Sequence, residues 1–296
     1  MNIGVYRYAP TVDDLVGEVR SAADQGFTSF WMPQIFGLDT LTAFAAAARE
    51  VPGIHLGTAA VPIYREHPMA LAQQALTVSQ VNGGRVILGI GLSHQVVVES
   101  MWGRSYARPL RHMRKYLEAL IPMLSGEASS VNGEAVSSHG SVDVAAPAPQ
   151  VLVAALGPKM LELAGQVADG TVTWMVGPKT LAAHIVPSIN RAAEVADRPR
   201  PQIAAGLPVC VTDNPEKARE RVAEFLVMYG GLPSYRAMLD REGAGGPEDI
   251  AVIGSAAEVA DRLAGVSESG VTTIAASEVG NPDELAATRD VLVSLL

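Results

Sequence analysis

Runs of apolar residues alternate with helical patterns from one end of the chain to the other. Eight short runs are interpreted as strands, and most are apolar at consecutive positions: NIGVYR, FTSFWMP, IHLGTAAVP, RVILGIG, VLVAAL, DGTVTWM, QIAAGLPVCV and VTTIAA. Strands that are apolar on both faces are typical of parallel sheets covered by helices. Eight such strands in 296 residues predict an α/β fold, a (β/α)₈ barrel formed as a single domain over residues 1–296.

The stretches between the strands carry helix-start signals. Thr11 is followed three residues later by Asp14, an N-cap pattern that predicts a helix whose apolar stripe begins at Leu15. A helix is expected over residues 39–50, and Pro68 opens another at the position where proline is tolerated. The pattern therefore predicts a helix after each of these strands, as a barrel requires.

Two connections are longer than a barrel needs. Residues 129–149 are polar and turn-rich and precede the fifth strand, whereas residues 214–250 carry helical patterns and precede the eighth. Both are interpreted as insertions. Additions of this length usually form part of the barrel mouth or of an oligomer contact, although a tolerated surface insertion fits the first one equally well.

Charge and composition argue against several classes of function. The formal net charge is -9 and basic residues are interleaved with acidic ones, which argues against partners such as nucleic acid or a membrane surface. No apolar run approaches the ~18 residues of a spanning helix. The chain enters a strand without a basic region or cleavage site, so a cytoplasmic protein is expected. Cys210 is the only cysteine and the histidines lack metal spacing, so neither a disulfide nor a metal site is expected.

The residues directly after each apolar run are the candidates for chemistry, because the active site of such barrels lies at the carboxyl ends of the strands. The set is Tyr6 and Arg7, Pro33 and Gln34, Ala59 to Pro62, Leu92 to His94, Ala155 to Lys159, and Trp174 to Lys179. It is poor in carboxylates, which gives little support to glycoside or metal-dependent hydrolysis. Two turns, ALGPKM and MVGPKT, place Gly-Pro-Lys at a helix start suited to a phosphate, although Gly-Pro is also ordinary helix punctuation.

The stretch VILGIGLSHQ, residues 86–95, holds two glycines that resemble a dinucleotide-binding turn. That fingerprint needs a third glycine where His94 stands, and an acidic residue about 20 positions further on, where the sequence RHMRK is basic. The stretch is therefore interpreted as the end of the fourth barrel strand.

Two long blocks resemble the bacterial luciferase-like superfamily, in the branch that uses the deazaflavin coenzyme F-420. They are LGTAAVPIYREHPMALAQQALTVSQVNGGRVILGIGLSHQ and AALGPKMLELAGQVADGTVTW, and the resemblance runs through most of the chain. It implies a (β/α)₈ barrel, commonly a homodimer, in which hydride passes between C5 of the deazaflavin and a small organic substrate. An FMN-dependent monooxygenase and a flavin-binding barrel without turnover stay open as alternatives. So does a non-redox aldolase or isomerase, for which Lys159 and Lys179 are poorly placed.

The resemblance also implies where the cofactor lies. It puts a non-proline cis peptide behind the ring at Ala59 and Ala60. It puts the turn after the fourth strand beside the ring or its phosphate tail, the turn after the fifth around the phosphate, and the end of the sixth on the flank of the pocket. The implied cofactor residues are Ala59, Ala60, Gly91, Leu92, Ser93, His94, Ala155, Leu156, Gly157, Pro158, Lys159, Trp174 and Gly177.

Two positions depart from the family pattern. Many relatives carry an acidic residue followed by histidine where this chain has Pro33 and Gln34, and some place a glutamate where His94 stands. The catalytic candidates are then His94, whose reference pKa of about 6.5 suits proton transfer, and Gln34, which can only hydrogen-bond. A binding role that moves no proton fits His94 as well.

Overall fold

A computed structural model describes residues 1–296. Eight parallel strands close into a barrel: β1 (Ile3–Tyr6), β2 (Ser29–Met32), β3 (His55–Thr58), β5 (Val86–Gly91), β8 (Gln150–Val153), β9 (Gly170–Trp174), β10 (Gln202–Val211) and β12 (Thr273–Glu278). Each strand pairs with the next, and β12 pairs with β1 to complete the ring. The barrel and its eight strands, predicted from the apolar runs, are confirmed.

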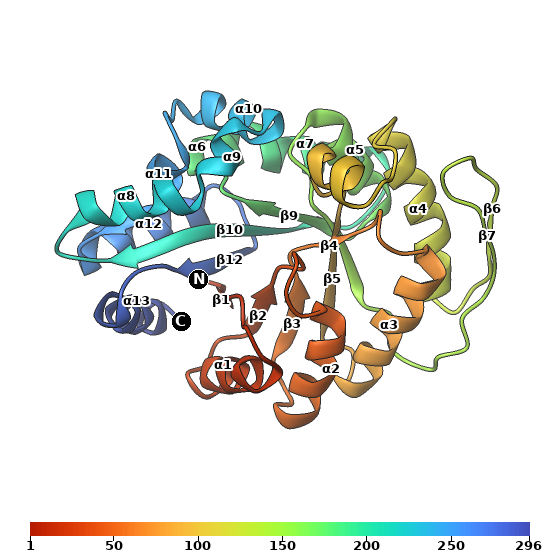
Figure 1. Ribbon diagram of the computed structural model, residues 1–296, viewed down its shortest axis with the longest axis horizontal. Coiled ribbons are helices and arrows are strands. Elements are labelled where there is room, and N and C mark those ends of the chain that lie inside the picture. Colours follow the sequence, from red (N-terminus) through yellow and green to blue (C-terminus); the bar gives the residue numbers. More distant parts are fainter.

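Helices cover the outside of the barrel (Figure 1). They are α1 (Val12–Asp24), α2 (Thr40–Glu50), α3 (Pro68–Val81), α4 (Pro109–Leu124), α5 (Pro158–Val167), α7 (Val186–Val195), α12 (Ala256–Glu268) and α13 (Pro282–Ser294). The side chain of Thr11 accepts the N–H of Asp14 at 3.1 Å, which is the predicted cap of α1. Pro68 stands in the first turn of α3 as predicted.

Both predicted insertions are present. Residues 129–149 contain an antiparallel pair, β6 (Ser129–Val131) and β7 (Ser138–Gly140). The segment before β12 contains α8 (Pro215–Phe225), α9 (Val227–Gly231), α10 (Pro233–Glu242), α11 (Pro247–Ile250) and β11 (Val252–Gly254), which extends the sheet beside β10. Shorter elements are β4 (Val61–Pro62), α6 (Pro178–Thr180) and two π-helical turns, η1 (Val97–Met101) and η2 (Leu181–Ile185). In Figure 1, α6, α9 and α10 lie together at one side of the barrel.

The interior of the barrel is filled by a compact apolar cluster. Its members are Trp31, Ile87, Leu152, Val172, Ala204 and Ala275. Trp31 is fully buried, and a Cβ at Gly57 would overlap its indole, so glycine on β3 makes room for the ring. Tyr6, Ala59, Ala60 and Ala154 pack on this cluster. The barrel is therefore a solid core, and these four residues cover it at the carboxyl ends of the strands.

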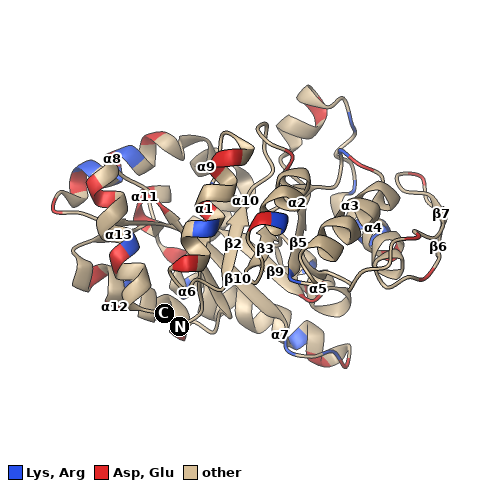
Figure 2. Ribbon diagram, turned by 90° about the horizontal axis from the view of Figure 1, so that it is seen from below, with Lys and Arg blue, Asp and Glu red and all other residues tan.

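Charged residues lie on the outer helices and loops (Figure 2). Acidic and basic side chains alternate on α8, while β2, β3, β5, β9 and β10 carry none. None of the helices combines the length and apolar character that a transmembrane span requires.

Candidate functional site

A cavity of about 360 Å³ lies at the carboxyl ends of the barrel strands. Its walls come from the ends of β1, β2, β3, β5, β8 and β9, and from the added helices α9 and α10. Of the 27 residues that line it, none is an aspartate, glutamate, lysine or arginine. The chain also has no group of three histidine, cysteine or acidic side chains that could hold a metal ion. Chemistry in this cavity therefore depends on neutral groups.

Small residues form the floor of the cavity. Ala59, Ala60, Gly91 and Ala154 all line it. A Cβ added to Gly91 would lie 3.2 Å from the Cβ of Ala154 and 3.5 Å from that of Ala60. The Ala59–Ala60 peptide is cis, which confirms the prediction made at this position. Because the side chains of the floor are small, a flat molecule can approach the main chain closely here.

Two stacked aromatic rings stand beside the floor. Tyr6 and Trp174 have ring centroids 4.9 Å apart and planes inclined by 15°. The Tyr6 hydroxyl donates a hydrogen bond to the carbonyl oxygen of Ala59 at 3.2 Å. Burial raises the pKa of Tyr6 well above its usual 10.0, so the phenol stays protonated at neutral pH. The pair forms a rigid, uncharged wall.

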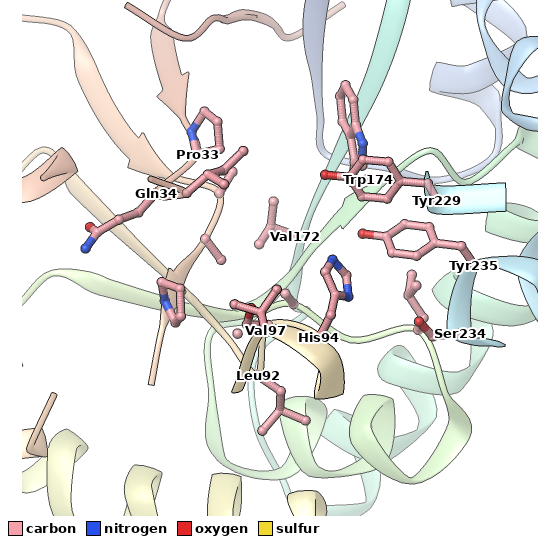
Figure 3. Close-up of a pocket in the computed structure, with 18 of the residues that line it drawn as sticks. Pro33, Gln34, Leu92, His94, Val97, Val172, Trp174, Tyr229, Ser234 and Tyr235 are labelled. Atoms are coloured by element: carbon pink, nitrogen blue, oxygen red, sulfur yellow. The ribbon is translucent and has the colours of Figure 1, made fainter. Parts of the chain in front are cut away.

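His94 lies next to two tyrosines on one side of the cavity (Figure 3). Its ring is edge-on to those of Tyr229 and Tyr235, with centroids 6.0 Å away in each case. Ser93, with φ of 59°, turns the chain after β5 just before His94. Burial lowers the pKa of His94 below its usual 6.5 and raises the pKa of both tyrosines. All three side chains are therefore neutral hydrogen-bonding groups at pH 7.

Tyr229 and Tyr235 are site residues that the sequence analysis missed. They lie on α9 and α10, within the insertion that was expected to form part of the barrel mouth or of an oligomer contact. Tyr106, also missed, lines the cavity and donates a hydrogen bond from its hydroxyl to the carbonyl of Ser93 at 3.4 Å. The only available signal was the presence of aromatic residues in otherwise polar connections, which does not say where a side chain points.

Gln34 lies at the cavity wall but its amide is used elsewhere. The amide nitrogen donates to Asp39 at 3.0 Å, and the amide oxygen accepts the N–H of Thr40 at 3.4 Å. In Figure 3 the amide points away from His94. Gln34 therefore holds the start of α2, and this geometry does not support the catalytic role considered for it.

The two Gly-Pro-Lys turns differ in whether their helix start is free. At α6, the carboxylate of Glu242 accepts the N–H groups of Lys179 at 3.1 Å and Thr180 at 2.7 Å. A side chain at the buried Gly177 would collide with this carboxylate. Gly177 does not line the cavity. The α6 turn is therefore occupied by the protein's own anion.

The start of α5 has no such cap. No side chain accepts its N–H groups, and a Cβ at Gly157 would meet nothing within 4 Å. Gly157 lines the cavity together with Ala155 and Leu156, whereas Pro158 and Lys159 are exposed just outside it. Met160 and Leu161 donate their N–H groups to the carbonyl of Gly157, and Pro158 has none, so the N–H of Lys159 is the first-turn donor left free for an anion at the cavity edge.

Among the predicted cofactor residues, the structure brings ten together at the cavity. They are Ala59, Ala60, Gly91, Leu92, Ser93, His94, Ala155, Leu156, Gly157 and Trp174. Thr173, which the sequence analysis did not single out, also borders the cavity. It is almost fully buried, and its hydroxyl has no hydrogen-bond partner.

Comparison with known proteins finds a matching family model and similar relatives. Residues 2–273 match the family model for luciferase-like monooxygenases. A 5,10-methylenetetrahydromethanopterin reductase of Methanolobus tindarius is 27% identical over 279 residues, which are 93% of this chain and 85% of that protein.

Solved structures share the fold. An F-420-dependent secondary alcohol dehydrogenase, in complex with an F-420–acetone adduct, has a TM-score of 0.83 at 19% identity, covering 100% of this chain and 98% of that one. The oxygenating constituent of 3,6-diketocamphane monooxygenase from the CAM plasmid of Pseudomonas putida, in complex with FMN, has a TM-score of 0.78 at 19% identity, covering 99% and 96%.

Proposed function

The chain belongs to the luciferase-like monooxygenase family, and from that premise we propose that it is an oxidoreductase that passes a hydride between coenzyme F-420 and an organic substrate. The observation that carries the proposal is one cavity in which a floor of small residues leads to the uncapped start of α5. The floor of small residues suits a flat ring, and the uncapped start of α5 suits the phosphate of its tail.

The residues present fit a deazaflavin. The ring would lie on Ala59 and Ala60, beside Gly91 and His94, and the unpartnered hydroxyl of Thr173 would gain a partner from the polar edge of the ring. The turn after β8 would hold the tail. The remaining proposed cofactor residues are Leu92, Ser93, Ala155, Leu156, Gly157, Pro158, Lys159 and Trp174. When bound, the coenzyme supplies a hydride donor or acceptor at C5.

The protein's own contribution is orientation and exclusion of water. His94 and Tyr235 offer neutral donors for a carbonyl or hydroxyl group of the substrate. We propose that His94 gives or takes the proton that accompanies hydride transfer, because it is the imidazole within the cavity. The apolar walls keep competing water away from the reacting atoms.

The proposal is tested by binding followed by turnover. Purified protein is titrated with oxidised coenzyme F-420 and, separately, with FMN, and quenching of ligand fluorescence is followed. Saturable binding of the deazaflavin, and its reduction by alcohols or reoxidation by ketones, enones or imines, is the expected result. FMN binding alone, with oxygen-dependent turnover, would instead support a flavin monooxygenase. Deazaflavin binding without turnover would indicate a binding protein.

Lys159→Ala is expected to weaken coenzyme F-420 binding by about tenfold at low salt, because it removes the cation beside the free start of α5. Lys179→Ala is the matched control, since it stands in the second Gly-Pro-Lys turn, where Glu242 already occupies the N–H groups. It is expected to leave affinity unchanged. Equal effects of the two substitutions would contradict the assignment of the phosphate to α5.

For alcohol oxidation, in which neutral His94 takes the proton, the pH profile of kcat/KM should lose activity on the acid side only below pH 6.5. Burial lowers the pKa of His94 from that value, so the neutral imidazole persists to a lower pH than it does in a free histidine. His94→Gln should remove this acid limb. A limb above pH 6.5, or one that survives in the variant, would show that another group controls the profile.

We also propose that the protein is a homodimer, as members of the resembling superfamily commonly are. Apolar residues make up 48% of the chain, and the insertions add surface beyond the barrel. Sedimentation at micromolar concentration is expected to give a species of twice 31.0 kDa. A single 31.0 kDa species would contradict this.

A further inference from the structure

Resting on the proposed function, we infer that the substrate is an uncharged molecule with one hydrogen-bonding group and an extended apolar part that lies against Ile35, Phe36 and Met228. These three residues, called here the apolar mouth, line the cavity where it opens to solvent. The inference follows from the charge of the walls, the position of the polar groups and the exposure of the mouth.

The walls disfavour a charged substrate. No lining residue carries a permanent charge, so a buried carboxylate or ammonium group would lose its hydration without gaining a partner. The protein's net charge of -9 adds a general repulsion of anions. The start of α5 is the place at the cavity edge that suits an anion, and the proposed phosphate of the coenzyme takes it.

Three hydrogen-bonding side chains meet on one side of the cavity. In Figure 3, His94, Tyr229 and Tyr235 converge, and the hydroxyl groups of both tyrosines point into the cavity. Across from them in Figure 3, Pro33 lines the cavity and the amide of Gln34 points away from it, while apolar residues such as Val172 and Val97 lie between. One hydrogen-bonding group of a substrate can therefore be satisfied beside His94, while the rest of the molecule meets hydrocarbon.

The three residues of the apolar mouth are exposed to solvent, and a bound substrate would bury them. Ile35 is 49% exposed, Phe36 61% and Met228 56%. Ile35 and Phe36 follow Pro33 on the β2–α2 loop, and Met228 precedes Tyr229 on α9. Pro33 and Tyr229 lie on opposite sides of the cavity in Figure 3. Single exposed apolar residues are ordinary, but several around one opening form a patch that a ligand can cover.

A compact substrate would reach His94 and leave the mouth uncovered. A longer hydrocarbon chain would pass between the two sides of the mouth and bury them, with a gain of about threefold to fourfold in binding for each methylene group transferred from water. The inference therefore predicts a dependence on chain length as well as on charge.

The first test uses a series of methyl ketones from acetone to 2-decanone, with reduced coenzyme F-420 as hydride donor. We expect kcat/KM to rise by about threefold to fourfold per methylene until the mouth is filled. Keto acids of matched length, with a terminal carboxylate, should be poorer by about a hundredfold. If kcat/KM does not change with chain length, or if the keto acids are preferred, the inference is overturned while the proposed function stays intact.

Variants connect the chain-length dependence to the mouth. Phe36→Ser and Met228→Ser should each reduce the gain per methylene. Val195→Ser is the matched control, because Val195 is 79% exposed at the end of α7 and does not line the cavity. Equal slopes in all three variants and the parent protein would overturn the inference.

A binding measurement separates this inference from the redox proposal. Prodan, an uncharged fluorescent ketone, should bind with a blue-shifted emission, and Phe36→Ser and Met228→Ser should each weaken it by about fivefold. If prodan behaves so but coenzyme F-420 does not bind, the redox proposal fails and the preference for an uncharged apolar ligand stands. If the two variants change only the sedimentation of the protein and not prodan affinity, the mouth is a subunit contact and the inference is wrong.

Discussion

Ala60→Phe is expected to weaken the binding of coenzyme F-420 by about a hundredfold, equivalent to about 2.7 kcal/mol. Ala60 is half-buried and lines the floor of the cavity, so a larger side chain at this position would project into the cavity. The phenyl ring would occupy the space proposed for the deazaflavin. Because Ala60 packs on top of the barrel interior without forming part of it, the melting temperature should change little.

Fluorescence titration measures the affinity, and thermal unfolding of the same samples measures the stability. Ala287→Phe is the matched control, since Ala287 is a half-buried alanine on α13 that does not line the cavity. Its affinity for the coenzyme should equal that of the parent protein. If Ala60→Phe keeps its affinity within about threefold, the ring does not lie on this floor.

The barrel could be predicted from the sequence because its determinants are local. Apolar residues in both phases identify parallel strands, and caps such as Thr11 before α1 act within a single turn of helix. The strand-end residues could be predicted for the same reason, since a barrel brings the carboxyl ends of its strands to one face. The cis peptide at Ala59 and Ala60 has no local sequence pattern, so only the family resemblance could predict it.

Long-range contacts account for what local patterns could not predict. The two Gly-Pro-Lys turns look alike in sequence, and they differ because Glu242, more than 60 residues further on, reaches the start of α6. Gln34 stands at a strand end, but its partner Asp39 turns the amide toward α2. Tyr229 and Tyr235 reach the cavity only through the packing of α9 and α10 over the barrel. Each of these depends on the fold as a whole.

Glu278 connects the barrel to two outer helices, and its replacement should have the largest effect on stability. Its carboxylate is 2% exposed at the end of β12 and accepts two hydrogen bonds from Arg289 on α13, each at 2.5 Å. It also pairs with Arg7 at 3.4 Å, and Arg7 in turn pairs with Glu18 on α1. Arg7 directly follows Tyr6, so this network lies behind the stacked wall of the cavity.

Glu278→Gln should therefore lower the free energy of unfolding by about 3 kcal/mol, because it leaves the largely buried guanidinium of Arg289 with only the more distant and partly exposed Glu18, 3.9 Å away, as a counter-ion. Urea denaturation measures the change. Glu50→Gln is the control, since Glu50 pairs with Arg20 at 3.6 Å with both side chains more than half exposed, and its loss should cost no more than about 1 kcal/mol. Arg289→Met in the Glu278→Gln background should restore part of the lost stability by removing the stranded charge. A loss as small as that of Glu50→Gln would mean that water reaches Arg289 and that the network does not hold α13 to the barrel.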